Sequence, residues 1–223
     1  VSPGVAGVAL KILHVYKDFD PPVRGGMERH MALMCRFQRE WADVEAMTCS
    51  RSMLTSVVDR AGTKVTEVGE WGRFQGAPIA PKFPLHLRMA KADVTVVHVP
   101  NPTAELSWLV SRPKGKLVVR YQSDVVRQAR AMRVYAPWQQ KFLAKADVIL
   151  VSSQQYLDSS ETLAVFKDKC RVVPLGIVAE DFSSPDAELL TECHDHYGKR
   201  YVLFAGRHRY YKGLQVLVKA AQA

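Results

Sequence analysis

Short runs of hydrophobic residues alternate along the chain with longer segments in which hydrophobic and polar residues mix. The runs have the length of β-strands, and several are rich in β-branched residues without polar interruption, which is typical of strands buried on both faces of a parallel sheet. Strands are predicted over residues 12–16, 44–49, 64–68, 94–99, 116–121, 148–151, 171–173 and 201–205. Strands that alternate with helices at this spacing predict an α/β fold with a doubly wound, mostly parallel, Rossmann-like sheet.

Between these runs, hydrophobic residues recur at the three- and four-residue spacing of amphipathic helices. Met27, Met31 and Met34 begin such a pattern directly after Gly25 and Gly26. Further helices are predicted over residues 50–60, 84–92 and 103–111, the last of them capped by Thr103. Another follows Asp124 and runs to about residue 145, with an interruption at Pro137. The last two are predicted from Ser152 or Ser153 to residue 166 and from residue 214. Residues 69–84 are rich in Gly and Pro and predict a loop that Phe74, Ile79 and Phe83 anchor.

The pattern divides the chain into four parts. Residues 1–9 predict a flexible leader, and residues 10–180 predict the Rossmann-like domain. Residues 181–199 are polar and predict an interdomain linker with a short helix. Residues 200–223 are interpreted as the first βα unit of a second, incomplete domain. Since one strand and one helix cannot bury both of their faces, this unit is expected to dock, to pair with another chain or to stay disordered.

Charge and cysteine content narrow the classes of partner. A net charge of +9 predicts attraction to nucleic acid, acidic lipid headgroups or phosphorylated substrates. No zinc finger or RNA-recognition pattern is present, which argues against nucleic acid. No hydrophobic run approaches the roughly 20 residues that span a bilayer. The four cysteines, Cys35, Cys49, Cys170 and Cys193, form no C-x-x-C pair, which is typical of reduced thiols in a cytoplasmic protein.

Candidate chemistry gathers at the loops that follow the strands. Ligands of doubly wound sheets bind beyond the carboxyl ends of the strands, which here carry residues 21–26, 98–102, 122–124 and 152–153. Gly25 and Gly26 precede a helix, and bare backbone N–H groups at a helix N-terminus can bind a phosphate. The same Gly-Gly pair also fits an ordinary turn.

Six segments, taken in order, resemble the retaining GT-B glycosyltransferases of the family-4 (group 1) type. They are PPVRGGMERH, VVHVPNP, VVRYQSDVVRQ, ADVILVSSQQYL, RVVPLGI and VLFAGRHRYYKGL, and they cover nearly the whole chain. The resemblance implies a GT-B architecture, in which two Rossmann-like domains face each other across a cleft. It also implies that the acceptor binds mainly to the first domain and the nucleotide-sugar mainly to the second.

The resemblance implies that Arg207 and Lys212 bind the donor pyrophosphate together with Gly25 and Gly26 from the first domain. A departing nucleoside diphosphate develops negative charge, which two fixed cations stabilise. Without the resemblance, Arg207 and Lys212 also fit a solvated basic loop. The resemblance implies that the acidic E-x7-E segment of the second domain is missing from this chain, which is therefore interpreted as an incomplete enzyme that is inactive alone.

His98, Asp124 and Gln122 form the candidate catalytic set. His98 ends a buried strand at the ligand-binding edge, where it either contacts substrate or caps the structure. Asp124 can hold a sugar hydroxyl or cap its helix. The resemblance implies a histidine near the donor sugar at the position of Gln122. Glutamine can hydrogen-bond a sugar hydroxyl, but it does not titrate near neutral pH.

No metal site is predicted. Asp18 and Asp20 form a D-x-D pattern, the metal signature of a different glycosyltransferase fold, and residues 193–196 place metal-ligand types on adjacent positions that rarely converge on one ion. Glu28 is interpreted as a partner of the helix dipole. Residues 125–145 combine basic and aromatic side chains, which fits either a surface that lies on anionic lipid or, preferably, a core helix with a basic rim.

The sequence therefore predicts a metal-independent hexosyltransferase of cell-envelope polysaccharide biosynthesis. It would move a sugar from a GDP- or UDP-linked nucleotide-sugar to a sugar or lipid-linked acceptor with retention, and it needs no other cofactor. The expected location is the cytoplasm, with peripheral contact to the inner face of the membrane left open. Two alternatives also stay open: a GT-B nucleotide-sugar epimerase, and a non-catalytic module that binds anionic glycans or membrane.

Overall fold

The computed structural model describes residues 10–124, 129–182, 186–198, 200–206, 208 and 212–222. The predicted leader, the predicted helix start at residues 125–128 and the site residue Arg207 lie outside these ranges. By its internal contacts the chain divides into two compact units, Val1–Gly176 and Ile177–Ala223.

The first unit is built on a mostly parallel sheet, which confirms the predicted fold class. Among the described residues the strand order is β10-β9-β8-β7-β1-β2-β4-β3, and each neighbouring pair is parallel except β3 and β4. The strands are β1 (Lys11–Val15), β2 (Asp43–Cys49), β3 (Ser56–Arg60), β4 (Thr63–Val68), β7 (Val94–Val99), β8 (Lys116–Tyr121), β9 (Val148–Val151) and β10 (Cys170–Val172). The short strands β5 (Arg73–Phe74) and β6 (Ala77–Pro78) form a separate hairpin.

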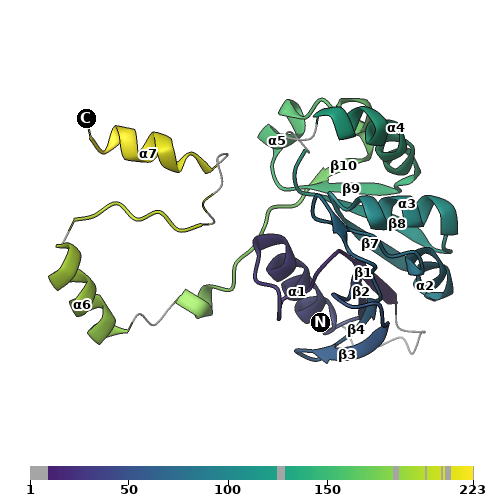
Figure 1. Cartoon of the computed structure of the whole chain (residues 1–223), viewed down its shortest axis with the longest axis horizontal. Helices are drawn as coiled ribbons and strands as arrows, with labels where there is room; N and C mark the ends of the chain where they lie inside the picture. Colours follow the sequence, from purple (N-terminus) through teal and green to yellow (C-terminus); the bar gives the residue numbers. More distant parts are fainter. Residues whose placement is uncertain are drawn as a thin grey trace, which may run out of the picture. The chain divides into compact units, whose positions relative to one another are not determined.

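Helices cover both faces of the sheet (Figure 1). On one face α1 (Gly26–Gln38) packs Met31 and Cys35 against β1, β2 and β4. On the other face α2 (Phe83–Met89), α3 (Pro102–Ser111) and α4 (Ala129–Lys145) enclose a second core, to which α5 (Gln154–Ser159) and the 3-10 helix η1 (Ala164–Lys169) also contribute. Hydrophobic side chains on both faces explain why the strands read as continuous hydrophobic runs.

The helix predicted over residues 50–60 is wrong. Residues 56–60 form the edge strand β3, which pairs with β4 through a tight turn at Ala61 and Gly62, both with positive φ. Arg60 donates to Glu67 across this hairpin at 2.8 Å. The segment has few apolar residues, so its sequence does not show the pattern of a half-buried strand. In the structure Val57 is 59% exposed. Local sequence therefore did not distinguish the two structures.

Smaller predictions also need correction. Asn101 rather than Thr103 caps α3, because its Oδ1 accepts the backbone N–H of Ala104 at 3.3 Å and Pro102 already occupies the first helical turn. Of the predicted loop anchors, only Phe83 is buried, whereas Phe74 and Ile79 are exposed. Residues 69–84 contain the β5–β6 hairpin and the start of α2 rather than a plain loop.

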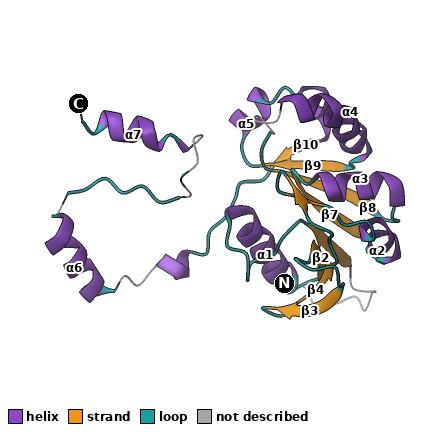
Figure 2. Ribbon diagram, viewed as in Figure 1, coloured by secondary structure: helices purple, strands orange, loops and turns teal. Residues whose placement is uncertain are grey.

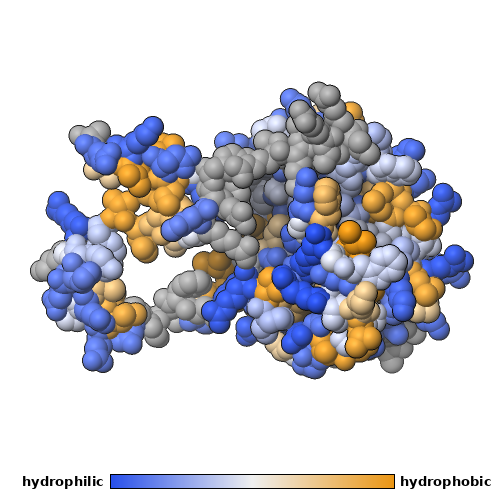
Figure 3. Space-filling view, in the orientation of Figure 1, coloured by the Kyte–Doolittle hydropathy of each residue, from blue (hydrophilic) through white to orange (hydrophobic). Residues whose placement is uncertain are grey.

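The second unit contains the 3-10 helix η2 (Ala179–Phe182), α6 (Ala187–Tyr197) and α7 (Leu214–Ala220). The strand predicted over residues 201–205 is not formed, and this stretch is drawn as loop in Figure 2. In the described part of the unit, no residue of α6 or α7 is buried, and Val202 and Leu203 are each 76% exposed. Figure 3 shows hydrophobic surface on this unit. A strand forms only with a partner, so the isolated stretch stays extended and unpaired.

Buried Glu105 is expected to give the first unit a pH-dependent stability. Its Oε1 accepts the backbone N–H of Asn101 at 2.8 Å at the start of α3. Burial raises the pKa of Glu105 from 4.5 to about 7. The protonated form is therefore favoured on folding, and the associated stability is lost as the pH rises from 4.5 through 7.

We expect Glu105→Gln to remove this dependence, because glutamine keeps the hydrogen bond without the charge. Between pH 5 and pH 8 the variant should gain about 2 kcal/mol of unfolding free energy relative to the wild type. Urea unfolding at both pH values measures this difference. Parallel pH dependences of the two proteins would show that Glu105 is not the responsible group.

Candidate functional site

The central strand β1 marks the point where the strand order reverses. β7 and β8 lie on one side of β1, and β2 and β4 lie on the other. At such a switch point the loops after neighbouring strands diverge and leave a crevice at the carboxyl edge, where ligands of doubly wound sheets bind. The loop from β1 to α1 and the residues that follow β7 and β8 therefore define the candidate site.

The N-terminus of α1 opens into this edge. Gly25 occupies the N-cap position in extended conformation, and among the described residues no side chain caps the helix. A Cβ placed on Gly26 would have no heavy atom of the described structure within 4 Å. This helix end thus has neither a side-chain cap nor a neighbour that crowds Gly26, which leaves the prediction of an anion at Gly25 and Gly26 open. Glu28 lies in this first turn and is buried, in agreement with a dipole partner.

His98 belongs to a relay of hydrogen-bonded side chains, in which both histidines are buried. Its Nε2 lies 3.0 Å from Nδ1 of His14 on β1, and Nε2 of His14 lies 2.6 Å from Oε1 of Gln38 on α1. Since the Gln38 oxygen can only accept, His14 donates to it through Nε2 and accepts from His98 through Nδ1. The His98 Nδ1 atom then carries a lone pair, and it has no hydrogen-bond partner among the described residues.

The electrostatics keep these rings neutral. Burial lowers the pKa of His14 to about 4. Burial also lowers the pKa of His98 well below 6.5, and the neighbouring His14, His30 and Arg120 lower it further. At neutral pH, His98 therefore presents an acceptor nitrogen that suits a sugar hydroxyl.

Gln122 directly follows β8, and its backbone N–H donates to Val99 O at 3.2 Å. Its Nε2 has no partner in the described structure, so it can donate to a ligand. Asp124 differs, because its carboxylate already accepts hydrogen bonds from three hydroxyls: Tyr121 at 2.8 Å, Tyr156 at 3.0 Å and Ser160 at 3.1 Å. These contacts fix the end of β8 to α5 and favour a positioning role for Asp124.

Asp18 of the D-x-D pattern belongs to an ion-pair network. Arg73 of the β5 strand donates to both carboxylate oxygens of Asp18 at 2.8 Å and to Glu70 at 2.9 Å. Both carboxylate oxygens of Asp18 are thus engaged by an arginine. Within the described ranges, no group of three or more His, Cys, Asp or Glu residues could hold a metal ion.

The remaining predicted residues lie in the second unit. Lys212 directly precedes α7, whose N-cap is Gly213 with φ 71°. Lys212 therefore lies just before a helix, and Arg207 is outside the described residues. Residues 193–196 lie on α6 and are largely exposed.

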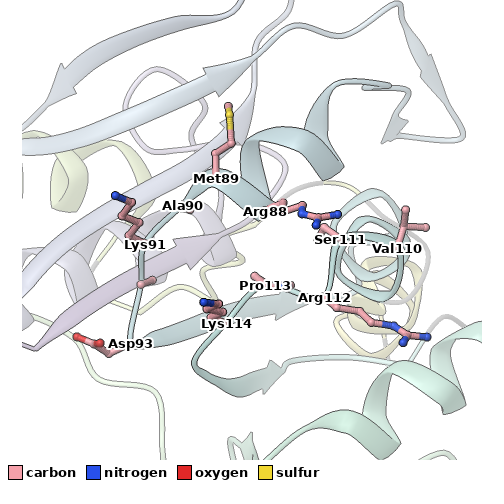
Figure 4. Close-up of a pocket in the computed structure, with 11 residues that line it drawn as sticks. Arg88, Met89, Ala90, Lys91, Asp93, Val110, Ser111, Arg112, Pro113 and Lys114 are labelled. Carbon is pink, nitrogen blue, oxygen red and sulfur yellow. The ribbon is translucent and has the colours of Figure 1, made fainter.

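A broad surface pocket of about 920 Å³ lies at the opposite edge of the sheet, between α2 and α3 (Figure 4). Its lining includes Asp93 before β7 and Lys114 before β8, so it opens at the amino ends of the strands. Four cations, Arg88, Lys91, Arg112 and Lys114, surround it. Its size alone does not make it the active site, because the carboxyl ends of the strands carry the switch point.

Residues 25–176 match the family model of the glycosyl transferase 4-like domain. The chain belongs to this family. The matched region of this glycosyl transferase 4-like chain begins at Gly25 and ends with the first structural unit, so it contains α1, His98 and Gln122, whereas His14 of the relay precedes it.

Two curated relatives match nearly the whole glycosyl transferase 4-like chain. The O-antigen chain mannosyltransferase C of Escherichia coli is 33% identical over 218 residues, which are 96% of this chain and 58% of the relative. The D-rhamnosyltransferase WbpZ of Pseudomonas aeruginosa is 29% identical over 220 residues, 96% of this chain and 57% of the relative. The chain thus spans somewhat more than half the length of these relatives.

Solved structures share the fold. A sucrose-phosphate synthase from Thermosynechococcus elongatus superposes with a TM-score of 0.70 at 16% identity, over 95% of this chain and 59% of that one. Anabaena HepE in complex with UDP gives a TM-score of 0.65 at 14% identity, over 95% and 57%. The glycosyl transferase 4-like chain therefore has the Rossmann-like architecture of GT-B glycosyltransferases. In its described part, no helix is both long and apolar enough to cross a membrane.

Sequence reasoning missed several members of the site. His14 and Gln38 are far from His98 in the sequence, and only the sheet and α1 bring them together. Arg120 was also missed, although a signal was present: it is a charged residue within the otherwise hydrophobic strand KLVVRY.

Proposed function

We propose that the full-length protein is a glycosyltransferase that moves a sugar from a nucleotide-sugar to a sugar or lipid-linked acceptor. The observation that carries the proposal is the uncapped N-terminus of α1 at the switch point of the sheet, beside a neutral histidine that can accept from a hydroxyl. A helix N-terminus can bind the diphosphate of the donor, and a neutral histidine can accept a hydrogen bond from a sugar hydroxyl. The names of two relatives, a mannosyltransferase and a rhamnosyltransferase, support the reaction class.

The finer features of the proposal rest on the family resemblance and on the chemistry of the site. We propose a GDP- or UDP-linked donor, transfer with retention and a role in cell-envelope polysaccharide synthesis. A related fold, HepE, was solved with UDP and with UDP and glucose. The engagement of Asp18 by Arg73 supports a metal-independent reaction.

We also propose a division of work between the two units. Gly25 and Gly26 approach the donor diphosphate from the first unit, and Arg207 and Lys212 bind it from the second. Residues 1–223 are proposed to be inactive alone, since they span 58% of the mannosyltransferase relative. The exposed hydrophobic side chains of α6, α7 and residues 201–205 support the idea that further protein covers them in the working enzyme.

The test is a thermal-unfolding panel of nucleotide-sugars on the full-length protein and on Gly26→Ala. A true donor should raise the melting temperature of the wild type, because a ligand of the folded state stabilises it by mass action. We expect the alanine methyl group to occupy the space of the phosphate and to weaken donor affinity by about 100-fold, the scale of losing donors to a charged group. The unliganded melting temperature should not fall, since the methyl group has room.

Gly76→Ala is the matched control. Gly76 lies in the β5–β6 turn with φ 83°, also with no heavy atom of the described structure within 4 Å of an added Cβ. This variant should lose about 1 kcal/mol of stability through backbone strain and keep its response to the donor. A wild-type protein that no nucleotide-sugar or nucleoside diphosphate stabilises would refute the proposed function.

A further inference from the structure

Arg120 is a buried cation on the α1-side face of the sheet, near the carboxyl end of β8. It lies on β8 in register with His98 on β7, so the two side chains are neighbours on one face. Arg120 is 1% exposed and His98 is fully buried. Arg120 lies within electrostatic reach of His98 and His30, because its charge lowers the pKa of both.

Within the described structure the guanidinium group of Arg120 has no counter-ion. Its Nε, Nη1 and Nη2 atoms are all buried without a hydrogen-bond partner. Burial lowers the pKa of Arg120, and no carboxylate among the described residues acts against this effect. The neighbouring residues 125–134, which are described only in part, contain no Asp or Glu in their sequence.

This arrangement is costly for the free protein. An uncompensated buried charge destabilises a fold by several kcal/mol, and arginine cannot escape by losing its proton. Arg73 differs from Arg120 in this respect, because its partly buried guanidinium binds two carboxylates. Polar groups without partners are expected where a ligand supplies them.

The polar atoms around Arg120 indicate which kind of ligand would bind there. Gln122 lies two residues further along the same face, and its Nε2 is also buried and unpartnered. The His30 Nε2 atom on α1 is in the same state. The relay through His14 leaves the His98 Nδ1 atom as an acceptor. We call these residues the Arg120 cluster: Arg120, Gln122, His30 and His98. The cluster combines a guanidinium group with an acceptor nitrogen.

We propose that the Arg120 cluster binds an oxyanion carried by a sugar substrate, with Arg120 and Gln122 donating to the oxyanion and His98 accepting from a sugar hydroxyl beside it. An oxyanion next to hydroxyls is the chemistry of a sugar phosphate. The assignment to a substrate rests on the proposed function, whereas the oxyanion site itself does not. The phosphate belongs either to the nucleotide donor or to a phosphorylated acceptor.

The experiment compares Arg120→Met with the wild type in the full-length protein, by thermal unfolding with inorganic phosphate, glucose 6-phosphate, GDP, UDP and glucose. We expect an effective anion at ten times its dissociation constant to raise the wild-type melting temperature by about 3–6 °C. Arg120→Met should show no such rise and, without ligand, should be at least as stable as the wild type. Arg88→Met, which removes an exposed arginine at the opposite edge, should respond like the wild type.

The ligands separate the two sources of the phosphate. A rise with GDP or UDP that Arg120→Met abolishes places the oxyanion on the donor, whereas one with glucose 6-phosphate alone places it on the acceptor. If no anion stabilises the wild type, or if Arg120→Met keeps the full rise, the proposed oxyanion site is wrong. An Arg120-dependent rise with inorganic phosphate would uphold the site even if every nucleotide-sugar failed.

Arg120→Lys is the second variant, for the case that Arg120→Met does not fold. It keeps the charge and loses the two-pronged donor geometry, so phosphate affinity should fall about tenfold. An affinity equal to that of the wild type would contradict the proposal.

Discussion

Arg73→Met is expected to lower the free energy of unfolding by about 3–5 kcal/mol, the range for breaking a buried ion pair by removing one partner. Arg73 binds Asp18 through two hydrogen bonds of 2.8 Å and Glu70 through one of 2.9 Å. Asp18 and Glu70 are only 6% and 7% exposed. The variant leaves two carboxylates buried close together with only the exposed Arg51 near Asp18, and methionine offers neither of them a donor.

Arg51→Met is a control on the same carboxylate. Arg51 lies 3.6 Å from Asp18, but its side chain is 64% exposed. An exposed ion pair contributes at most about 1 kcal/mol, so Arg51→Met should change stability by no more than that. Urea unfolding of both variants gives the comparison. Similar losses for the two arginines would show that burial of the Arg73 pair does not set its strength.

The triple variant Arg73→Met, Asp18→Asn, Glu70→Gln separates charge from packing. It removes all three charges and retains side chains of similar size, so it should recover part of the stability that Arg73→Met loses. No recovery would mean that the loss comes from packing of the β5–β6 hairpin rather than from stranded carboxylates.

The fold was predictable where burial on both faces leaves a continuous hydrophobic run. Residues 94–99 and 116–121 were predicted as strands with the bounds that β7 and β8 have. The edge strand β3 was not, because one face is open to solvent and the local pattern carries little information. The hairpin β5–β6 was missed for a related reason: it is held by the Arg73–Asp18 pair across 55 residues of sequence.

The candidate site was predictable only in its location. The rule that ligands bind at the carboxyl edge of the strands pointed to Gly25, His98 and Gln122, and the structure places all three after or at the ends of β1, β7 and β8. The partners of these residues depend on register. His14 reaches His98 only because β1 and β7 are adjacent, and Asp124 meets Tyr156 and Ser160 only because α5 packs beside β8.

The strand β8 carries Arg120 and leads to Gln122, and the turn that precedes it depends on Gly115. Gly115 has φ 92°, a conformation that disfavours any residue with a Cβ. A Cβ at this position would lie 2.5 Å from the backbone oxygens of both Ala92 and Asp93. These are main-chain atoms that no rotamer change can move. The Asp93 oxygen also accepts the N–H of Lys116 at 2.8 Å, so any shift of this residue disturbs the start of β8.

Gly115→Ala is therefore expected to cost about 3–5 kcal/mol, the sum of left-handed backbone strain and a clash in a packed region. Gly76→Ala shares the positive φ but has open space around its Cβ, and it should cost about 1 kcal/mol. The difference between the two, measured by urea unfolding, isolates the clash.

Asp93 also joins β1 to β7, since its carboxylate accepts the N–H of Lys11 at 2.9 Å and its own N–H donates to Lys11 O at 2.9 Å. Displacing Asp93 should loosen all three central strands at once, so equal costs for the two alanine variants would show that the Ala92–Asp93 backbone yields without disturbing the sheet.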